Sequence, residues 1–158
     1  MTYRGPNTRM YGSASMYGSA SMYDSASMSG SASMSGSASM SGSARMSGSA
    51  SMSGSARMSG EGDASHQDHV AWVDRVGSGS SMTLHRIRIN GGYGWRINAG
   101  CVHFEADTVA GVCEKVRANV LAIPEQWQGQ PAETIGRWAR QVFLALEFLA
   151  SMVNEETP

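Results

Sequence analysis

The sequence has few of the residues and segments that mark secreted, disulfide-linked or membrane proteins. Cys101 and Cys113 are its two cysteines among 158 residues, too few for the dense disulfide framework of a small secreted domain. The first residues lack the apolar core of a signal peptide. No apolar run reaches the roughly 18 residues that a membrane span needs. We therefore expect a chain without a membrane segment that is cytoplasmic by default.

Charge is also sparse. The chain has 12 Lys and Arg against 13 Asp and Glu, a net charge of −1. Residues 1–60 carry four Arg and one acid, and residues 61–158 carry eight basic residues and twelve acids. This mild asymmetry does not require a nucleic-acid or membrane partner.

β-Branched residues are nearly absent from the first 60 residues, which form a hexapeptide repeat. Methionine recurs at every sixth residue from Met10 to Met58 in the unit Gly-Ser-Ala-Ser-Met-Ser. Tyr replaces Ser at positions 11, 17 and 23, and Arg replaces it at 45 and 57. In an extended chain this alternation gives one face of Gly, Ala and Met and another of Ser. The pattern resembles that of silk-like Gly-Ala-Ser sequences.

The repeat allows three interpretations. We expect residues 1–62 to be a flexible arm, because Ser and Gly dominate and Ala and Met bury too little to offset the entropy of ordering. The alternative is ordered extended structure, such as a stacked solenoid or an inter-chain sheet. A third interpretation uses the methionines as Cu(I) ligands, but in a strand their spacing of about 20 Å does not make them converge. We therefore expect no cofactor. Arg45 and Arg57 are candidate contacts for an anionic partner.

Residues 63–158 are predicted to form a small folded domain. Valines at 70, 73 and 76 recur at helical spacing, which predicts a helix over 65–76, with a strand as the alternative. Alternation and turn signals predict three antiparallel strands, and apolar periodicity predicts two further helices. The strands are expected over 83–89, 93–98 and 101–105, and the helices over 108–122 and 131–153. The predicted fold class is α+β: a small three-stranded antiparallel sheet packed with two to three helices, behind a low-complexity arm.

The outward faces of the predicted strands suggest a nucleic-acid surface. The candidate residues are Arg86, Arg88, Arg96 and Asn98, near His103 and Glu105. Three arginines beside an asparagine can contact phosphates and base edges. The order of three strands and a helix is similar to plant ethylene-response DNA-binding domains, and an added first helix makes it similar to double-stranded RNA-binding domains. Only topology is shared, so no residue roles carry over. The net acidic charge of the domain argues against this function.

The predicted last helix is apolar around most of its circumference. Such a helix is buried on more than one face, and a domain of this size has little surface to cover it. We therefore expect a homo-oligomer, although the helix can also be the central core of a monomer. The candidate interface residues are Ile135, Trp138, Val142, Leu146, Leu149 and Met152. Arg137 and Arg140 are too few to favour membrane binding.

No residue pattern predicts catalysis or a metal site. His66, His69, Cys101 and His103 have loose spacings unlike those of structural zinc sites. Cys113 falls on an apolar stripe, where a thiol is inert. The glycines at 91, 92 and 94 are too closely spaced for a phosphate-binding loop. We predict a structural or interaction protein that is not an enzyme, a self-associating domain that displays or tethers the repeat arm. The alternative is a small nucleic-acid-binding accessory protein.

Overall fold

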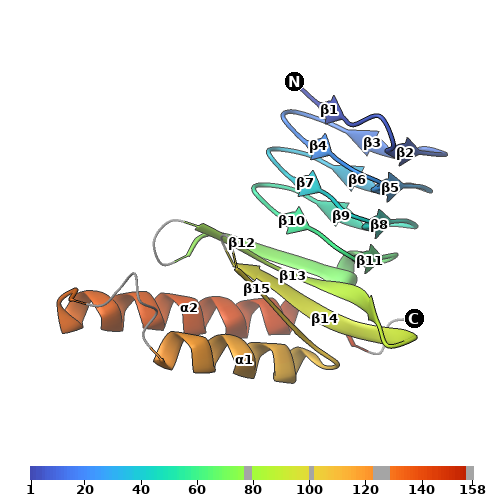
Figure 1. Ribbon diagram of the computed structural model, residues 1–158. Coiled ribbons are helices and arrows are strands. Elements are labelled where there is room, and N and C mark those ends of the chain that lie inside the picture. The colour runs from blue at the N-terminus through green and yellow to red at the C-terminus, as the bar shows by residue number, and fades with distance from the viewer. Residues whose placement is uncertain (77–79, 100–101, 123–128, 156–158) are drawn as a thin grey trace.

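The protein consists of three stacked layers (Figure 1), as seen in a computed structural model that describes residues 1–76, 80–99, 102–122 and 129–155. A parallel β-solenoid forms the first layer. A four-stranded antiparallel sheet lies across one end of the solenoid, and two helices cover the opposite face of that sheet. The described chain is therefore mostly β, and the predicted α+β fold with a three-stranded sheet behind a flexible arm is wrong.

The solenoid is built from short strands of two residues each. They are β1 (Tyr3–Arg4), β2 (Arg9–Met10), β3 (Ser15–Met16), β4 (Ser21–Met22), β5 (Ser27–Met28), β6 (Ser33–Met34), β7 (Ser39–Met40), β8 (Arg45–Met46), β9 (Ser51–Met52), β10 (Arg57–Met58) and β11 (Asp63–Ala64). They form three parallel sheets in the orders β1-β4-β7-β10, β2-β5-β8-β11 and β3-β6-β9. Each strand pairs with the strand three repeats later, as Ser15 does with Ser33. Three hexapeptides therefore close one coil, and the repeat winds through about three coils.

Stacking between coils supplies the core that a single hexapeptide lacks. Each methionine lies over the methionine one coil away, as Met22 does over Met40. From Met22 to Met58 and from Ala20 to Ala64, the inward methionines and alanines are at most 1% exposed. Backbone bonds link the coils, and the Ser33 N–H donates to the Ala50 carbonyl at 3.0 Å. The flexible-arm prediction failed because it considered each repeat alone, whereas repeats of this kind are stabilised by their neighbours.

The repeat glycines form the corners of each coil. Gly36 has a φ of 65°, and a Cβ atom there would lie 3.0 Å from the backbone of Gly54 in the next coil. Only glycine adopts this conformation readily. Asp24 takes a corner position with a φ of 55°, and its carboxylate accepts the N–H of Gly42 at 3.0 Å.

The antiparallel sheet follows the solenoid and closes its end. Its strands are β12 (Val70–Val76), β13 (Ser80–Ile89), β14 (Gly92–Ala99) and β15 (Val102–Ala106), in that order across the sheet, and the 3-10 helix η1 (Gln67–His69) precedes them. The predicted helix over 65–76 is wrong, since β12 pairs with β13 along its length. Between Val73 and Val76 the register shifts at a bulge, where Arg75 has a φ of 60°. The extra residue breaks the alternation of a strand, so Val73 and Val76 contact the same core, whereas Val70 lies in the solenoid core on the opposite face.

The two helices pack against the face of the sheet that lies away from the solenoid (Figure 1). They are α1 (Val109–Leu121) and α2 (Ala132–Met152), close to the predicted helices. Thr108 caps α1, its hydroxyl accepting the Gly111 N–H at 3.0 Å. We call the sheet and the two helices together the base. Neither helix is long and apolar enough to cross a membrane, among the residues that the structure describes.

Candidate functional site

The outer surface of the solenoid carries one row of side chains on each of its three faces. Strand pairing fixes which residues share a row. The rows are Tyr3, Ser21, Ser39 and Arg57 on the first face, Arg9, Ser27, Arg45 and Asp63 on the second, and Ser15, Ser33 and Ser51 on the third. Successive members are about 4.8 Å apart, the spacing of hydrogen-bonded strands. The solenoid thus holds polar groups at fixed intervals.

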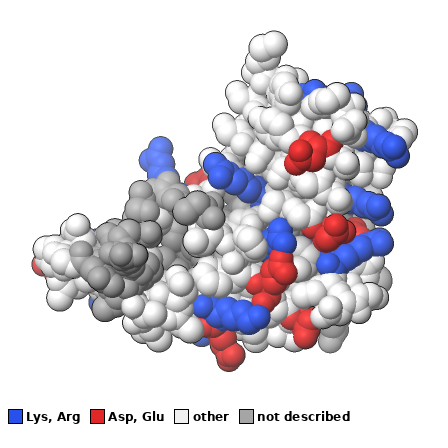
Figure 2. All heavy atoms as spheres, in the orientation of Figure 1, with Lys and Arg blue, Asp and Glu red and all other residues white. Residues whose placement is uncertain are grey.

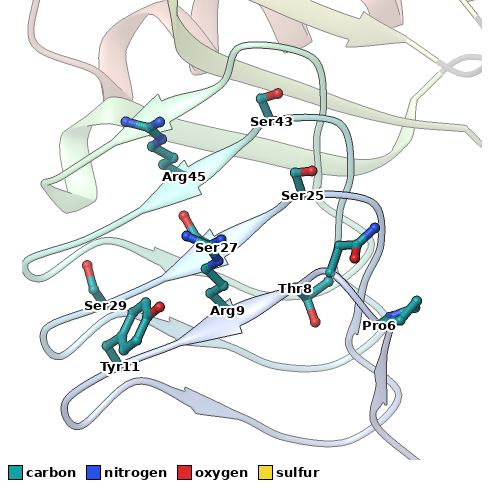
Figure 3. A pocket seen from close by; sticks show the side chains of 10 residues that line it. Pro6, Thr8, Arg9, Tyr11, Ser25, Ser27, Ser29, Ser43 and Arg45 are labelled. Atoms are coloured by element: carbon teal, nitrogen blue, oxygen red, sulfur yellow. The ribbon is translucent and has the colours of Figure 1, made fainter.

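A shallow groove of about 700 Å³ runs along the second face. Its lining is polar: Pro6, Asn7, Thr8, Arg9, Tyr11, Ser25, Ser27, Ser29, Ser43 and Arg45. Figure 3 shows Arg9, Ser27 and Arg45 projecting from successive strands along the middle of this groove. Tyr11 and Ser29 lie on one side of them, and serines from the preceding corners lie on the other. We call these lining residues the arginine–serine groove.

The two cations of the groove form no ion pair with an acidic side chain in the part of the chain that the structure describes. These cations, Arg9 and Arg45, are both exposed. Asp63 ends the row one strand below Arg45, but its carboxylate accepts a hydrogen bond from the Arg88 Nε at 2.6 Å. That hydrogen bond and the charge of Asp63 raise the pKa of the Arg88 guanidinium. In Figure 2, basic residues follow this side of the solenoid down toward the sheet, one acidic residue lies among the upper coils, and further acidic residues lie near the lower end. The groove therefore favours an anion.

The predicted nucleic-acid face lies mostly at the junction between the sheet and the solenoid. The Arg96 guanidinium donates to the Ser59 carbonyl at 3.0 Å and pairs with Glu105. Asn98 donates its side-chain N–H to a solenoid carbonyl at 2.9 Å. The Arg86 Nε donates to another solenoid carbonyl at 3.1 Å. Of the four candidates, Arg88 alone is largely exposed, with 54% of its side chain accessible.

A buried histidine lies inside this junction. The Nδ1 of His85 is 3.2 Å from the Arg86 carbonyl, and its Nε2 is 3.1 Å from the Asn98 side-chain nitrogen. These partners suit a neutral ring that donates at Nδ1 and accepts at Nε2. Burial lowers the pKa of His85 to about 4, and burial also lowers the pKa of Arg86. Nearby, the Thr83 hydroxyl accepts the Arg57 N–H at 2.9 Å. The junction is a hydrogen-bonded joint that fixes the solenoid on the base.

The residues considered for metal binding do not assemble. In the described parts of the chain, no three His, Cys, Asp or Glu side chains lie together as a metal site would need. The rings of His66 and His69 contact each other edge-on, with 5.2 Å between centroids. His103 is exposed on β15, and Cys101 lies outside the described residues. Burial raises the pKa of the Cys113 thiol, which disfavours the reactive thiolate.

The predicted oligomer residues occupy different environments on α2. Val142, Leu146 and Leu149 lie inside the core of the base. Ile135 and Trp138 are half-buried, and Met152 is exposed. Met152 belongs to an exposed apolar stripe with Leu144 and Phe148, which the candidate interface list left out; Leu144, Phe148 and Met152 are 59%, 47% and 52% exposed. Their spacing of four residues is the signal that identifies the stripe.

Comparison of the chain with models of known protein families, with curated proteins and with solved structures gives no match.

Proposed function

We propose that this chain is a structural interaction protein that associates with a second copy through α2 and displays its solenoid as a rigid projection. The observation that supports this proposal most is the apolar stripe of Leu144, Phe148 and Met152. The opposite side of α2 is already buried against the sheet. The stripe therefore lies outside the core of the base, as an exposed apolar surface that a partner can cover.

The charges beside the stripe favour a second copy in antiparallel orientation. Arg137 and Arg140 precede the stripe along the helix, whereas Glu147 lies within its span and also pairs with Arg117 at 3.9 Å. Glu155 lies beyond the end of α2, and its carboxylate accepts the Val109 N–H at 2.7 Å. Glu133 neutralises part of the basic half through an ion pair with Arg137 at 3.0 Å. Two antiparallel α2 helices bring the basic half of each toward the acidic half of the other, an arrangement that complementary charges stabilise.

The layered architecture is consistent with a display role. The helices lie on the side of the sheet away from the solenoid (Figure 1). Phe148 and Met152 line a pocket with Ser51 of the third row but with no residue of the arginine–serine groove, so association through α2 leaves that groove uncovered. The buried Met and Ala columns and the bonded junction fix the outer rows relative to the base. The proposed role requires no catalysed reaction, since the serines and arginines of the rows would act by binding a partner.

The experiment is size exclusion with light scattering on the full chain, using Phe148→Asp as the test variant and Asn119→Asp as its control. Asn119 is exposed on α1, outside the stripe, and its substitution adds the same charge. We expect a dimer for the natural chain and the control at low and high salt, and a monomer for Phe148→Asp with an unchanged circular dichroism spectrum. A monomeric natural chain, or a dimer that survives Phe148→Asp, would contradict self-association through the stripe.

A further inference from the structure

We propose that the arginine–serine groove binds a linear acidic polysaccharide, with Arg9 and Arg45 contacting successive acidic groups and the serines contacting sugar hydroxyls. This inference does not depend on self-association, because the groove lies on the solenoid and the apolar stripe lies on α2.

The placement of the two arginines favours an extended ligand with spaced charges. Arg9 and Arg45 belong to β2 and β8, and β5 with Ser27 lies between them. The two strands are therefore about 10 Å apart, twice the distance between neighbouring strands. A single small anion at one guanidinium does not reach the other. A chain that runs along the solenoid axis can satisfy both, since each guanidinium fork matches a carboxylate or sulfate.

The uncharged lining favours sugar between the acidic groups. The serine hydroxyls both donate and accept hydrogen bonds, as sugar hydroxyls do. Ser27 lies between the two arginines in their row, and Ser25, Ser29 and Ser43 line the groove on either side of it. Tyr11 is 60% exposed at the edge of the groove. Its ring offers a flat apolar surface for the C–H face of a sugar, with a hydroxyl at the tip.

The sparse charge of the groove disfavours nucleic acid as the ligand. A nucleic-acid site neutralises many closely spaced phosphates, and such domains usually carry a strong basic excess. Here two cations line the groove, and the chain has a net charge of −1. A polysaccharide with acidic groups separated by neutral hydroxyl-bearing units matches this pattern better.

The repeat itself provides matched variants for the test. Ser27 occupies the aligned position in the coil between Arg9 and Arg45. The coil therefore accepts serine at this position, and Arg9→Ser and Arg45→Ser should each keep its structure. Arg57→Ser makes the same change at the equivalent strand position on another face. Binding would be measured by calorimetry on the full chain with an alginate oligosaccharide for carboxylate, a heparin oligosaccharide for sulfate, neutral dextran and a single-stranded DNA oligonucleotide.

We expect alginate or heparin to bind, dextran not to bind, and Arg9→Ser and Arg45→Ser each to weaken binding roughly three- to tenfold. Arg57→Ser should leave the affinity within twofold. The proposal is overturned if neither acidic sugar binds, or if Arg57→Ser weakens binding as much as Arg45→Ser does, which indicates unspecific attraction. It is also overturned if the oligonucleotide binds more tightly than both sugars. None of these variants should change the oligomeric state, so the outcome is independent of the test on Phe148.

Discussion

Replacing one methionine inside the solenoid should destabilise the fold by an amount that depends on its coil. Met16 and Met34 stand in the same column of the third face, one coil apart. Met34 is fully buried, whereas Met16 in the first coil is half-buried. A buried Met→Ala substitution removes the transfer free energy of the side chain and leaves a cavity, at a cost of about 2–5 kcal/mol. We expect about 3 kcal/mol for Met34→Ala and about 1 kcal/mol for Met16→Ala, which has less buried area to lose.

The free energy of unfolding would be measured by denaturant titration, followed by far-ultraviolet circular dichroism and by tryptophan fluorescence. Trp72 packs against the solenoid core and so reports on the end of the solenoid nearest the base. A loss of about 3 kcal/mol is large beside the total of about 5–15 kcal/mol that is usual for a domain. Equal effects of the two substitutions, or a cost below about 0.5 kcal/mol for Met34→Ala, would refute the stacked-core explanation of the repeat.

Three further predictions test other parts of the structure. Trypsin should cleave after Arg45 and Arg57 far more slowly in the native chain than in denaturant, since both lie in hydrogen-bonded coils; equal rates followed by mass spectrometry would indicate a flexible arm after all. Lowering the pH from 7 to 4 should reduce the free energy of unfolding by up to about 3 kcal/mol through His85. In the unfolded chain this histidine has a pKa of about 6.5 and binds a proton below that pH. In the folded protein its pKa is about 4, so acid favours the unfolded state over this range. His85→Gln should flatten that dependence, and an identical pH profile would rule out this cause. Arg4→Met should produce concentration-dependent association in sedimentation experiments, because Arg4 stands over Met22 at the end of the solenoid away from the base and bonds the Thr8 carbonyl at 3.3 Å; unchanged sedimentation would contradict this expectation.

The hairpin at the centre of the sheet was predictable because its signals are local. Asn90 and Gly91 have φ angles of 51° and 80°, as a two-residue turn between twisted strands requires. Alternation did not fix the register: Leu84 lies opposite Ile97 and His85 lies opposite Arg96. By this pairing, and contrary to the prediction, Arg86 and Arg88 do not share the strand face of Arg96 and Asn98. The helices were predictable for a similar reason, since their apolar stripes and breaks are visible within one segment.

The stacked solenoid was the alternative interpretation of the repeat, and the same reasoning did not favour it because its stability is not local. A hexapeptide of Gly, Ser, Ala and Met has weak strand propensity and cannot bury its own side chains. The favourable contacts arise only when three repeats complete a coil and a further coil covers it. Alternation did show which side chains share a face. It did not show that this face closes into an interior.

The predicted arginine face of the sheet is a second feature that local reasoning could not place, because the solenoid covers it. Strand parity correctly places Arg96 and Asn98 on one side of the sheet, opposite Glu105 and His103 on β15. A polar strand face is normally solvated, so the sequence favoured an exposed surface. The end of a solenoid, however, has unpaired backbone groups that need partners. Polar side chains from the sheet supply them, as Asn98 does for the Arg57 carbonyl.

In this solenoid, two residues share an outer row when their separation in the sequence is a whole number of coils of 18 residues, as it is for Arg9, Ser27 and Arg45. Arg45 and Arg57 are two hexapeptides apart and suggested a common partner, yet they lie on different faces. Arg9 and Arg45 are six hexapeptides apart and share a row, because six hexapeptides make two complete coils. Packing fixes the Met and Ala positions, whereas the outward Ser positions are free to vary. Two arginines at serine positions of one row, as Arg9 and Arg45 are, therefore indicate a binding surface more strongly than two arginines that are merely close in the sequence.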